Sequence, residues 1–342
     1  MNRELHGLKL RALVRDHLAS GDAARRGLTI ASELAGEIAE PADIGVGAAV
    51  LVGTDAWVLV EDHHERALGV GLAWMQKSNA QTLNLIVSKG SGVLARRAAN
   101  FAIDIGVWEV AGRSLSRAVP HDHRPEIEPR ASHLEFGSMI LDSGADVVIE
   151  HGVVSGEVIG LEVCRVVDDE STGEPRLEIG VGVHDREAFA QLHGRTPLQE
   201  SLGRIVDVVR HHRRVGADPH PLNRLASERA LRSRIISDPS KIGAAHLRAV
   251  AMASPRVNLK DPSPCAALGE TANGEPLIAF FSTGIDLDVV PASADTRAWL
   301  VPTDARLVIV VPERDASPIT RRLAGALHLP ATLIGVPVHE TA

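Results

Sequence analysis

The strongest constraint on the fold is the alternation of short apolar strands with helical segments near both ends of the chain. Near the N-terminus, two β-rich runs around the turn Gly53-Thr54-Asp55 precede a helical segment, and the strands Leu83–Val87 and Gly106–Val110 follow. The C-terminal part shows the same alternation, with strands at 276–281, 306–311 and 332–336. Strands that alternate with helices are typical of parallel sheets with crossover connections. We therefore expect an α/β protein with Rossmann-like βαβαβ regions at both ends.

The length of 342 residues predicts more than one domain. Two proline-rich segments, 119–132 and 237–270, are expected to be linkers, and the alternative for the second is a segment that wraps around a domain. They separate an N-terminal region (1–118), a central α/β core (133–236) and a C-terminal region (271–342). The N-terminal region begins with two amphipathic helices, which leucine and isoleucine spacing predicts over Glu4–Ala19 and Thr29–Ala39.

Composition favours a soluble bacterial protein of the cytoplasm. No apolar run reaches the roughly 18 to 20 residues that a membrane helix needs, and the N-terminus lacks the pattern of a signal peptide. Cys164 and Cys265 are the only cysteines, and we expect both to be buried free thiols. The formal charge of −8 argues against a general nucleic-acid coat but is compatible with a local basic patch.

Two glutamates mark the central region as the first place to look for chemistry. Helical spacing from residue 133 is followed by strands predicted at 146–150, 157–167 and 177–183, and then by a second helix. Glu157 opens the second of these strands, and Glu178 lies on the third. Alternation of side chains along a strand allows the two acids to converge at neighbouring strand ends. The alternative is that both are solvated carboxylates without a common ligand.

This order of elements resembles the core of the restriction-endonuclease-like, or PD-(D/E)XK, nucleases over residues 133–191. The resemblance implies that Glu157 and Glu178 hold a divalent metal, Mg²⁺ or Mn²⁺, which activates water, and that Glu135 on the first helix assists. The family places a lysine two residues after the second acid. Here that position is Gly180, so the resemblance implies a degenerate nuclease-like core.

An arginine-rich stretch follows the central strands, between residues 195 and 234. Arginine binds phosphate through two parallel hydrogen bonds, so a cluster on an acidic protein is informative. The candidate nucleic-acid-binding residues are Arg204, Arg210, Arg213 and Arg214. The alternative is a helical face whose arginines are solvated or paired with acids.

Two loops are candidate ligand sites in the flanking regions. The turn Lys89-Gly90-Ser91-Gly92 precedes a predicted helix, where backbone amides attract phosphate. The loop Ser282–Asp288 follows a predicted strand, and its Ser282, Asp286 and Asp288 offer oxygens for a cation or a ribose. The alternative for both is a connecting loop whose polar groups serve the next helix.

Common catalytic signatures are missing, including the Walker loop, the dinucleotide-binding glycine motif and the metalloprotease helix. The leading hypothesis is a nucleic-acid-associated protein with a degenerate, metal-dependent nuclease-like core. One alternative is a regulatory protein that binds a small molecule or nucleotide without catalysis. Another is a protein-interaction scaffold, which the amphipathic N-terminal helices suggest.

Overall fold

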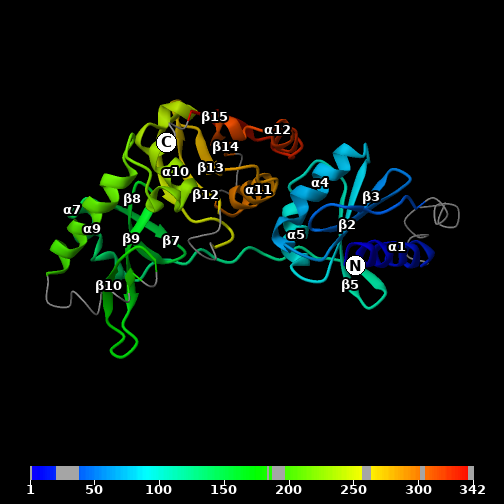
Figure 1. The fold of residues 1–342 in the computed structure, drawn as a ribbon, viewed down its shortest axis with the longest axis horizontal. Coiled ribbons are helices and arrows are strands. Elements are labelled where there is room, and N and C mark those ends of the chain that lie inside the picture. Colours follow the sequence, from blue (N-terminus) through cyan, green and yellow to red (C-terminus); the bar gives the residue numbers. More distant parts are fainter. Residues whose placement is uncertain are drawn as a thin grey trace. The chain divides into compact units, whose positions relative to one another are not determined.

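The computed structural model describes residues 2–20, 38–182, 185–186, 197–255, 263–300 and 305–337. They form a mixed α/β protein with three β-sheets (Figure 1). The chain divides into two compact units. Unit 1 comprises residues 1–123, 286–299 and 317–332, and unit 2 comprises residues 124–285, 300–316 and 333–342. The segment 21–37, which holds most of the predicted helix Thr29–Ala39, lies outside the described residues.

Unit 1 contains a six-stranded sheet in the order β1-β2-β3-β4-β5-β6. β3, β4 and β5 are parallel, with α4 and α5 in the connections between them, and the other neighbouring pairs are antiparallel. The predicted order of strands and helices over residues 48–110 is therefore confirmed. The strands are β1 (Ala42–Asp43), β2 (Gly47–Val52), β3 (Asp55–Val60), β4 (Thr82–Val87), β5 (Ile105–Ala111) and β6 (Ser114–Arg117). The helices are α1 (Asn2–Ala19), η1 (His64–Arg66), α4 (Ala67–Lys77), α5 (Ser91–Ala98), α11 (Val289–Leu300) and α12 (Pro318–Gly325).

Helices cover both faces of this sheet. Four apolar residues of α1, at helical spacing from Leu10 to Leu18, pack against Trp57 and Leu59 of β3. On the opposite side, Gly71 of α4 lies against the side chains of Leu83 and Leu85. Successive side chains of a strand point to opposite faces, so α1 and α4 enclose the sheet between two apolar layers. None of the described helices is long and apolar enough to cross a membrane.

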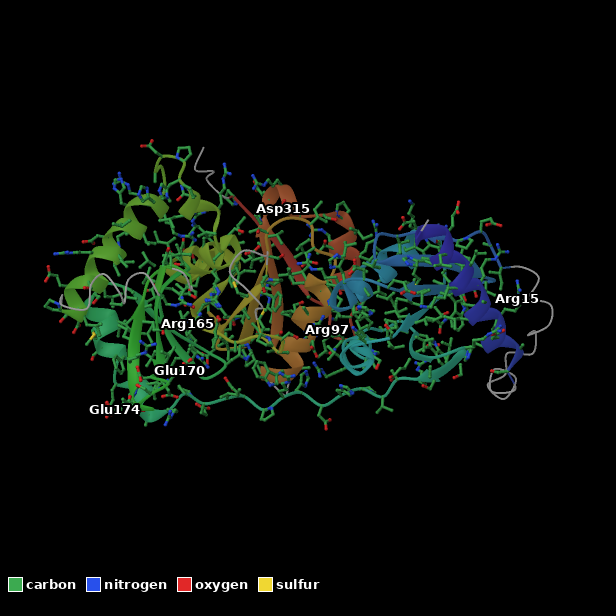
Figure 2. All side chains as sticks on the ribbon, turned by 60° about the horizontal axis from the view of Figure 1, so that its bottom comes forward. Arg15, Arg97, Arg165, Glu170, Glu174 and Asp315 are labelled. Carbon is green, nitrogen blue, oxygen red and sulfur yellow. The ribbon has the colours of Figure 1, made fainter. Side chains whose placement is uncertain are left out.

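The first sheet of unit 2 is an antiparallel meander in the order β10-β9-β8-β7. Its strands are β7 (Asp146–Glu150), β8 (Val153–Val158), β9 (Leu161–Asp168) and β10 (Pro175–Ile179). The prediction of one strand from 157 to 167 is wrong, because Ile159 and Gly160 form a tight turn with φ of 48° and 74°. Glu157 therefore lies near the end of β8 and does not open β9. Figure 2 labels Arg165 on β9, and Glu170 and Glu174 in the loop that joins β9 to β10.

The helices of unit 2 pack against this meander or against a second sheet. They are α6 (Ala131–Leu134), α7 (Gly137–Asp142), α9 (Leu198–Arg213), η2 (Pro221–Arg224), α10 (Ser227–Ser237), η3 (Pro239–Ile242) and η4 (Glu313–Asp315). The second sheet has the order β11-β12-β13-β14-β15, with β13 and β14 parallel. Its strands are β11 (Ala244–Val250), β12 (Cys265–Thr271), β13 (Pro276–Phe281), β14 (Arg306–Pro312) and β15 (Thr332–Val336).

The segment 237–270, expected to be a linker, instead contains β11 and most of β12. Both strands pair within the second sheet, and apolar residues such as Leu247 and Ala267 belong to its core. The prolines of this segment misled the prediction, because they lie outside the two strands. The division between the units near residue 123 does fall within the first expected linker, 119–132.

Candidate nucleic-acid interface

Glu157 belongs to a buried cluster of two glutamates and two arginines in unit 2. Arg232 on α10 donates from Nη1 to Glu150 at 2.6 Å and from Nη2 to Glu157 at 3.1 Å. Arg229, one turn earlier on α10, donates to the same two carboxylates. Only 3% of Glu157 and 1% of Arg232 is exposed. Charge balance within this ion-pair cluster makes its burial tolerable.

The pairing fixes the charge state of the cluster. Burial by itself raises the pKa of Glu150, but Arg232 and Arg229 outweigh it and bring the pKa below its usual value. Burial lowers the pKa of Arg229, whereas Glu157 and Glu150 raise it, and the net pKa is raised. Guanidinium groups thus occupy both carboxylates. A metal ion at Glu157 would have to displace them.

Glu178 lies in a different cluster. It accepts from Arg176 Nη2 at 2.8 Å and is 3.5 Å from Arg186 Nε. Arg186 also donates to Glu162, which Arg165 binds through two nitrogens. β9 lies between β8 and β10, so the strands of Glu157 and Glu178 are two strand spacings, about 10 Å, apart. The structure does not bring the two acids into one ion-pair cluster.

Glu135 and Gly180 complete the set of residues predicted for the nuclease-like site. Glu135 follows α6 and is exposed. At Gly180 the backbone has φ of 141°, and a Cβ would meet the backbone nitrogen of Arg186 at 2.8 Å, so a lysine does not fit there. Within the described ranges, no group of three His, Cys, Asp or Glu residues is placed to hold a metal ion. The Mg²⁺ or Mn²⁺ site stays a prediction.

Arg213, at the end of α9, is a buried cation that joins three segments of unit 2. Its guanidinium donates to the carbonyls of Ile159, Leu222 and Leu225, at distances between 2.5 and 3.1 Å. These bonds hold the end of α9 against the β8–β9 turn and the helix η2. Arg213 therefore fixes the course of the chain between α9 and α10.

Three further arginines lie around this connection without an acidic partner among the described residues. Arg214 follows α9, Arg224 ends η2, and Arg234 lies on α10. Burial first, and then the charge of Arg234, lower the pKa of Arg213 to about 10. The pKa of Arg234 is also lowered by burial. We call Arg214, Arg224 and Arg234 the arginine surface.

The other predicted arginines are partly engaged. Arg204 is paired with Glu200 at 2.5 Å. Arg210 donates to the carbonyl of Gly144 at 2.6 Å and is 3.7 Å from Asp207. Each guanidinium keeps N–H groups that could donate to a ligand, but its orientation is already set by these contacts.

Histidines lie beside the arginine surface. The rings of His212 and His220 are stacked, with centroids 3.7 Å apart and planes inclined by 12°. His220 Nδ1 accepts from the backbone N–H of Leu222 at 3.3 Å. His211 meets His212 edge-on at 5.1 Å. Burial, then His220 and His211, lowers the pKa of His212, so this ring favours the neutral state.

The predicted loop Lys89–Gly92 begins α5, and Gly90 has φ of 67°. The imidazole of His121 lies against Gly92, where a Cβ would be 2.2 Å from its Cδ2, and His121 N donates to the Gly92 carbonyl. Lys89 is exposed. A histidine thus occupies one side of the turn that was expected to hold phosphate.

The predicted residues of the loop 282–288 serve local structure. Ser282 is buried, and its N–H donates to the carbonyl of Val310. Asp286 accepts from the N–H of Asp288 at 3.0 Å, and Asp288 accepts from the N–H of Gly69 in the first turn of α4 at 3.1 Å. The second oxygen of Asp288 is buried and has no hydrogen-bond partner in the part of the chain that the structure describes.

Comparison with known proteins adds no relative. No family model, curated protein or solved structure matches this chain.

Sequence reasoning did not separate the arginines that are paired from those that are free. The partners of Arg229 and Arg232 lie 72 to 82 residues earlier in the chain, on β7 and β8. Arg234 was not selected as a candidate. Nothing in the sequence marks it as unpaired, because Asp238 stands four residues later, at the spacing of a helical ion pair.

Proposed function

We propose that this protein binds nucleic acid through the arginine surface of unit 2, and that the nuclease-like core beneath it is a scaffold without catalysis. One observation carries the proposal: three arginines near the buried Arg213, namely Arg214, Arg224 and Arg234, have no acidic partner among the described residues. The kinship of residues 133–236 to restriction-endonuclease-like folds, and of the flanking regions to Rossmann folds, stays a prediction.

The contrast within α10 supports this use of the arginines. Arg229 and Arg232 face Glu150 and Glu157, which neutralise them. Arg234, on the same helix, has no such partner in the part of the chain that the structure describes. Guanidinium groups that lack a carboxylate can offer their paired N–H donors to phosphate oxygens. A bound phosphate would supply the negative charge that this surface lacks.

The histidines add ring surfaces beside these cations. Bases of single-stranded nucleic acid stack on aromatic side chains, including histidine. His211 is exposed, and the His212–His220 stack is partly exposed. Single-stranded RNA or DNA is therefore expected to bind at least as well as a duplex.

Fluorescence anisotropy with labelled single-stranded RNA, single-stranded DNA and duplex DNA would test the proposal. We expect affinity to fall steeply between about 50 and about 200 mM salt, because phosphate contacts release counterions. The double variant Arg214→Ala/Arg224→Ala should weaken binding and lower the salt slope by about 2. The matched control is Arg130→Ala/Arg176→Ala, which removes two exposed arginines of the same unit that are already paired.

No binding to any of these nucleic acids, or equal losses in the variant and the control, would remove the proposal. The proposal that the core has no catalytic activity is tested separately, by incubating the protein and the nucleic acids that it binds with Mg²⁺ or Mn²⁺. Cleavage that disappears in Glu178→Ala would show that the core is catalytic.

A further inference from the structure

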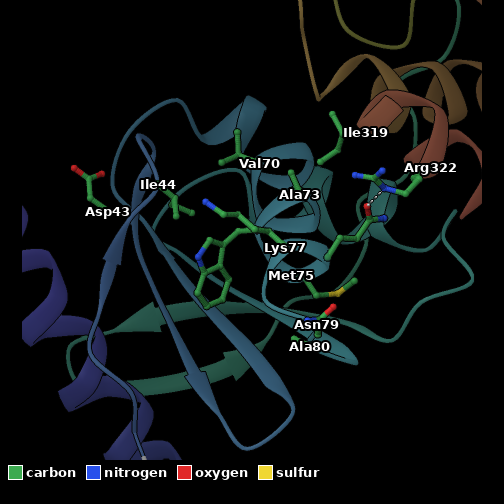
Figure 3. Close-up of a pocket in the computed structure, with 12 residues that line it drawn as sticks. Asp43, Ile44, Val70, Ala73, Met75, Lys77, Asn79, Ala80, Ile319 and Arg322 are labelled. Atoms are coloured by element: carbon green, nitrogen blue, oxygen red, sulfur yellow. Dashed lines mark hydrogen bonds between the residues drawn. The ribbon is translucent and has the colours of Figure 1, made fainter. Parts of the chain in front are cut away.

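Unit 1 contains a cavity of about 880 Å³ on the outer side of α4 (Figure 3). Its walls come from α4, from the β1–β2 turn and from α12, all within unit 1. The volume lies within the roughly 300 to 1,000 Å³ typical of small-molecule sites. Neither the loop Lys89–Gly92 nor the loop 282–288 contributes to it.

The wall of the cavity offers both apolar surface and an aromatic ring. Ile44, Val70 and Ile319 contribute apolar side chains. Trp74 is partly exposed in the wall, whereas Trp57 and Trp108 are buried in the core of the unit. A partly exposed indole is a stacking surface for a planar ring, and stacking of this kind is the usual way in which proteins hold bases.

Two cations border the same space. Lys77, at the end of α4, is exposed and has no acidic partner among the described residues. Arg322 of α12 donates from Nε to the side-chain oxygen of Gln76 at 3.3 Å, as the dashed line in Figure 3 shows, and its terminal nitrogens have no acidic partner within the described ranges.

One acid also lines the cavity. Asp43 is partly engaged, since it accepts from the N–H of Gly45 at 2.9 Å. The lining therefore has two positively charged side chains and one negatively charged side chain. This excess of positive charge favours an anionic ligand.

We propose that this cavity binds a nucleotide, with the base stacked on Trp74 and the phosphate held by Lys77 and Arg322. The side-chain amides of Gln76 and Asn79 in the lining can donate to and accept from a base edge or a ribose. The nucleotide site is separate from the arginine surface, because it is built from residues of the other unit and takes a small ligand. It does not depend on nucleic-acid binding by unit 2.

Isothermal titration calorimetry on the full chain would test the site with ATP and GTP, with adenosine and with inorganic pyrophosphate. We expect at least one nucleotide to bind more tightly than adenosine or pyrophosphate. Trp74→Leu should weaken that nucleotide at least about fivefold, as loss of one stacked base predicts, and should leave pyrophosphate unchanged. Lys77→Ala/Arg322→Ala should weaken the nucleotide and pyrophosphate but not adenosine.

Two control variants keep the test specific. Arg113→Ala removes an exposed arginine of unit 1 that does not line the cavity. Arg214→Ala/Arg224→Ala removes cations of the arginine surface. Both should bind the nucleotide as the wild type does, and circular dichroism should show that all variants are folded.

Absence of nucleotide binding, or unchanged affinity in the cavity variants, would overturn the proposal. Pyrophosphate that binds as tightly as the nucleotide, with no effect of Trp74→Leu, would also overturn it, because the site would then recognise phosphate alone.

Discussion

Arg232 Nη2 lies 3.1 Å from Glu157 Oε2 in the interior of unit 2, although 75 residues separate the two. The same guanidinium reaches the carbonyl of Ala266 on β12 at 3.3 Å. One arginine on α10 therefore contacts strands of both sheets of unit 2. Arg232 is thus a charged side chain in the interior of unit 2, where side chains are usually apolar. The fold depends on keeping its guanidinium paired with the carboxylates.

Replacing Glu157 should destabilise the protein strongly. Glu157→Gln removes one of the two charges that balance Arg229 and Arg232, and breaking a buried pair typically costs about 3 to 5 kcal/mol. Glu200→Gln is the matched control, because it breaks the exposed pair with Arg204, and exposed pairs contribute about 0 to 1 kcal/mol. Urea denaturation gives the free energy of unfolding of each. Equal losses would contradict the structural role assigned to Glu157.

Gly160 should not tolerate a side chain. It has φ of 74°, and a Cβ would lie 2.2 Å from the carbonyl group of Arg229. Gly160→Ala must therefore move the backbone of α10 that carries the ion-pair cluster, and we expect a loss above about 3 kcal/mol. Gly173→Ala has a similar φ of 70° and open space, so it should cost only about 1 kcal/mol. Thermal unfolding of the two variants separates the cost of the steric clash at Gly160 from the cost of the positive φ that both positions share.

The buried carboxyl group of Asp288 should make the stability of the protein depend on pH. Burial raises the pKa of this carboxyl group to about 7, so the folded state retains a proton that the unfolded state has lost. Stability should fall as pH rises from about 4 to about 7 and should then level off, with a total loss of up to about 4 kcal/mol. Asp288→Asn cannot ionise and should lack this loss. If denaturant midpoints at pH 5 and pH 8 differ equally in both proteins, Asp288 is not the group responsible.

The two cysteines should be unreactive in the folded protein. Both are buried free thiols, as the sequence predicted, and burial raises each pKa to about 12. Thiolate is the reactive form, so Ellman's reagent should react slowly with the native protein and fully after denaturation. Fast labelling of one thiol without denaturant would show that its part of unit 2 opens readily.

Local patterns were sufficient for many elements. The spacing of Leu10 to Leu18 predicted α1, and the pair Ser317-Pro318 predicted the start of α12, where Ser317 accepts from the N–H of Ile319. These predictions succeed because helical periodicity and N-capping depend on residues within a few positions of each other. The turn at Ile159-Gly160 was missed because apolar residues on both sides continue the strand pattern.

The amino-acid sequence by itself determined the α/β character, most helices and strands, and which residue types carry charge. Only the tertiary structure decided which charges are free. Glu157 and Arg232 neutralise each other across 75 residues, while Arg214 and Arg224 keep no acidic partner among the described residues. A side chain becomes a ligand-binding group or an internal ion pair according to what lies within a few ångströms of it. Those neighbours are brought close by packing between segments that are far apart in the sequence, and local periodicity does not encode that packing.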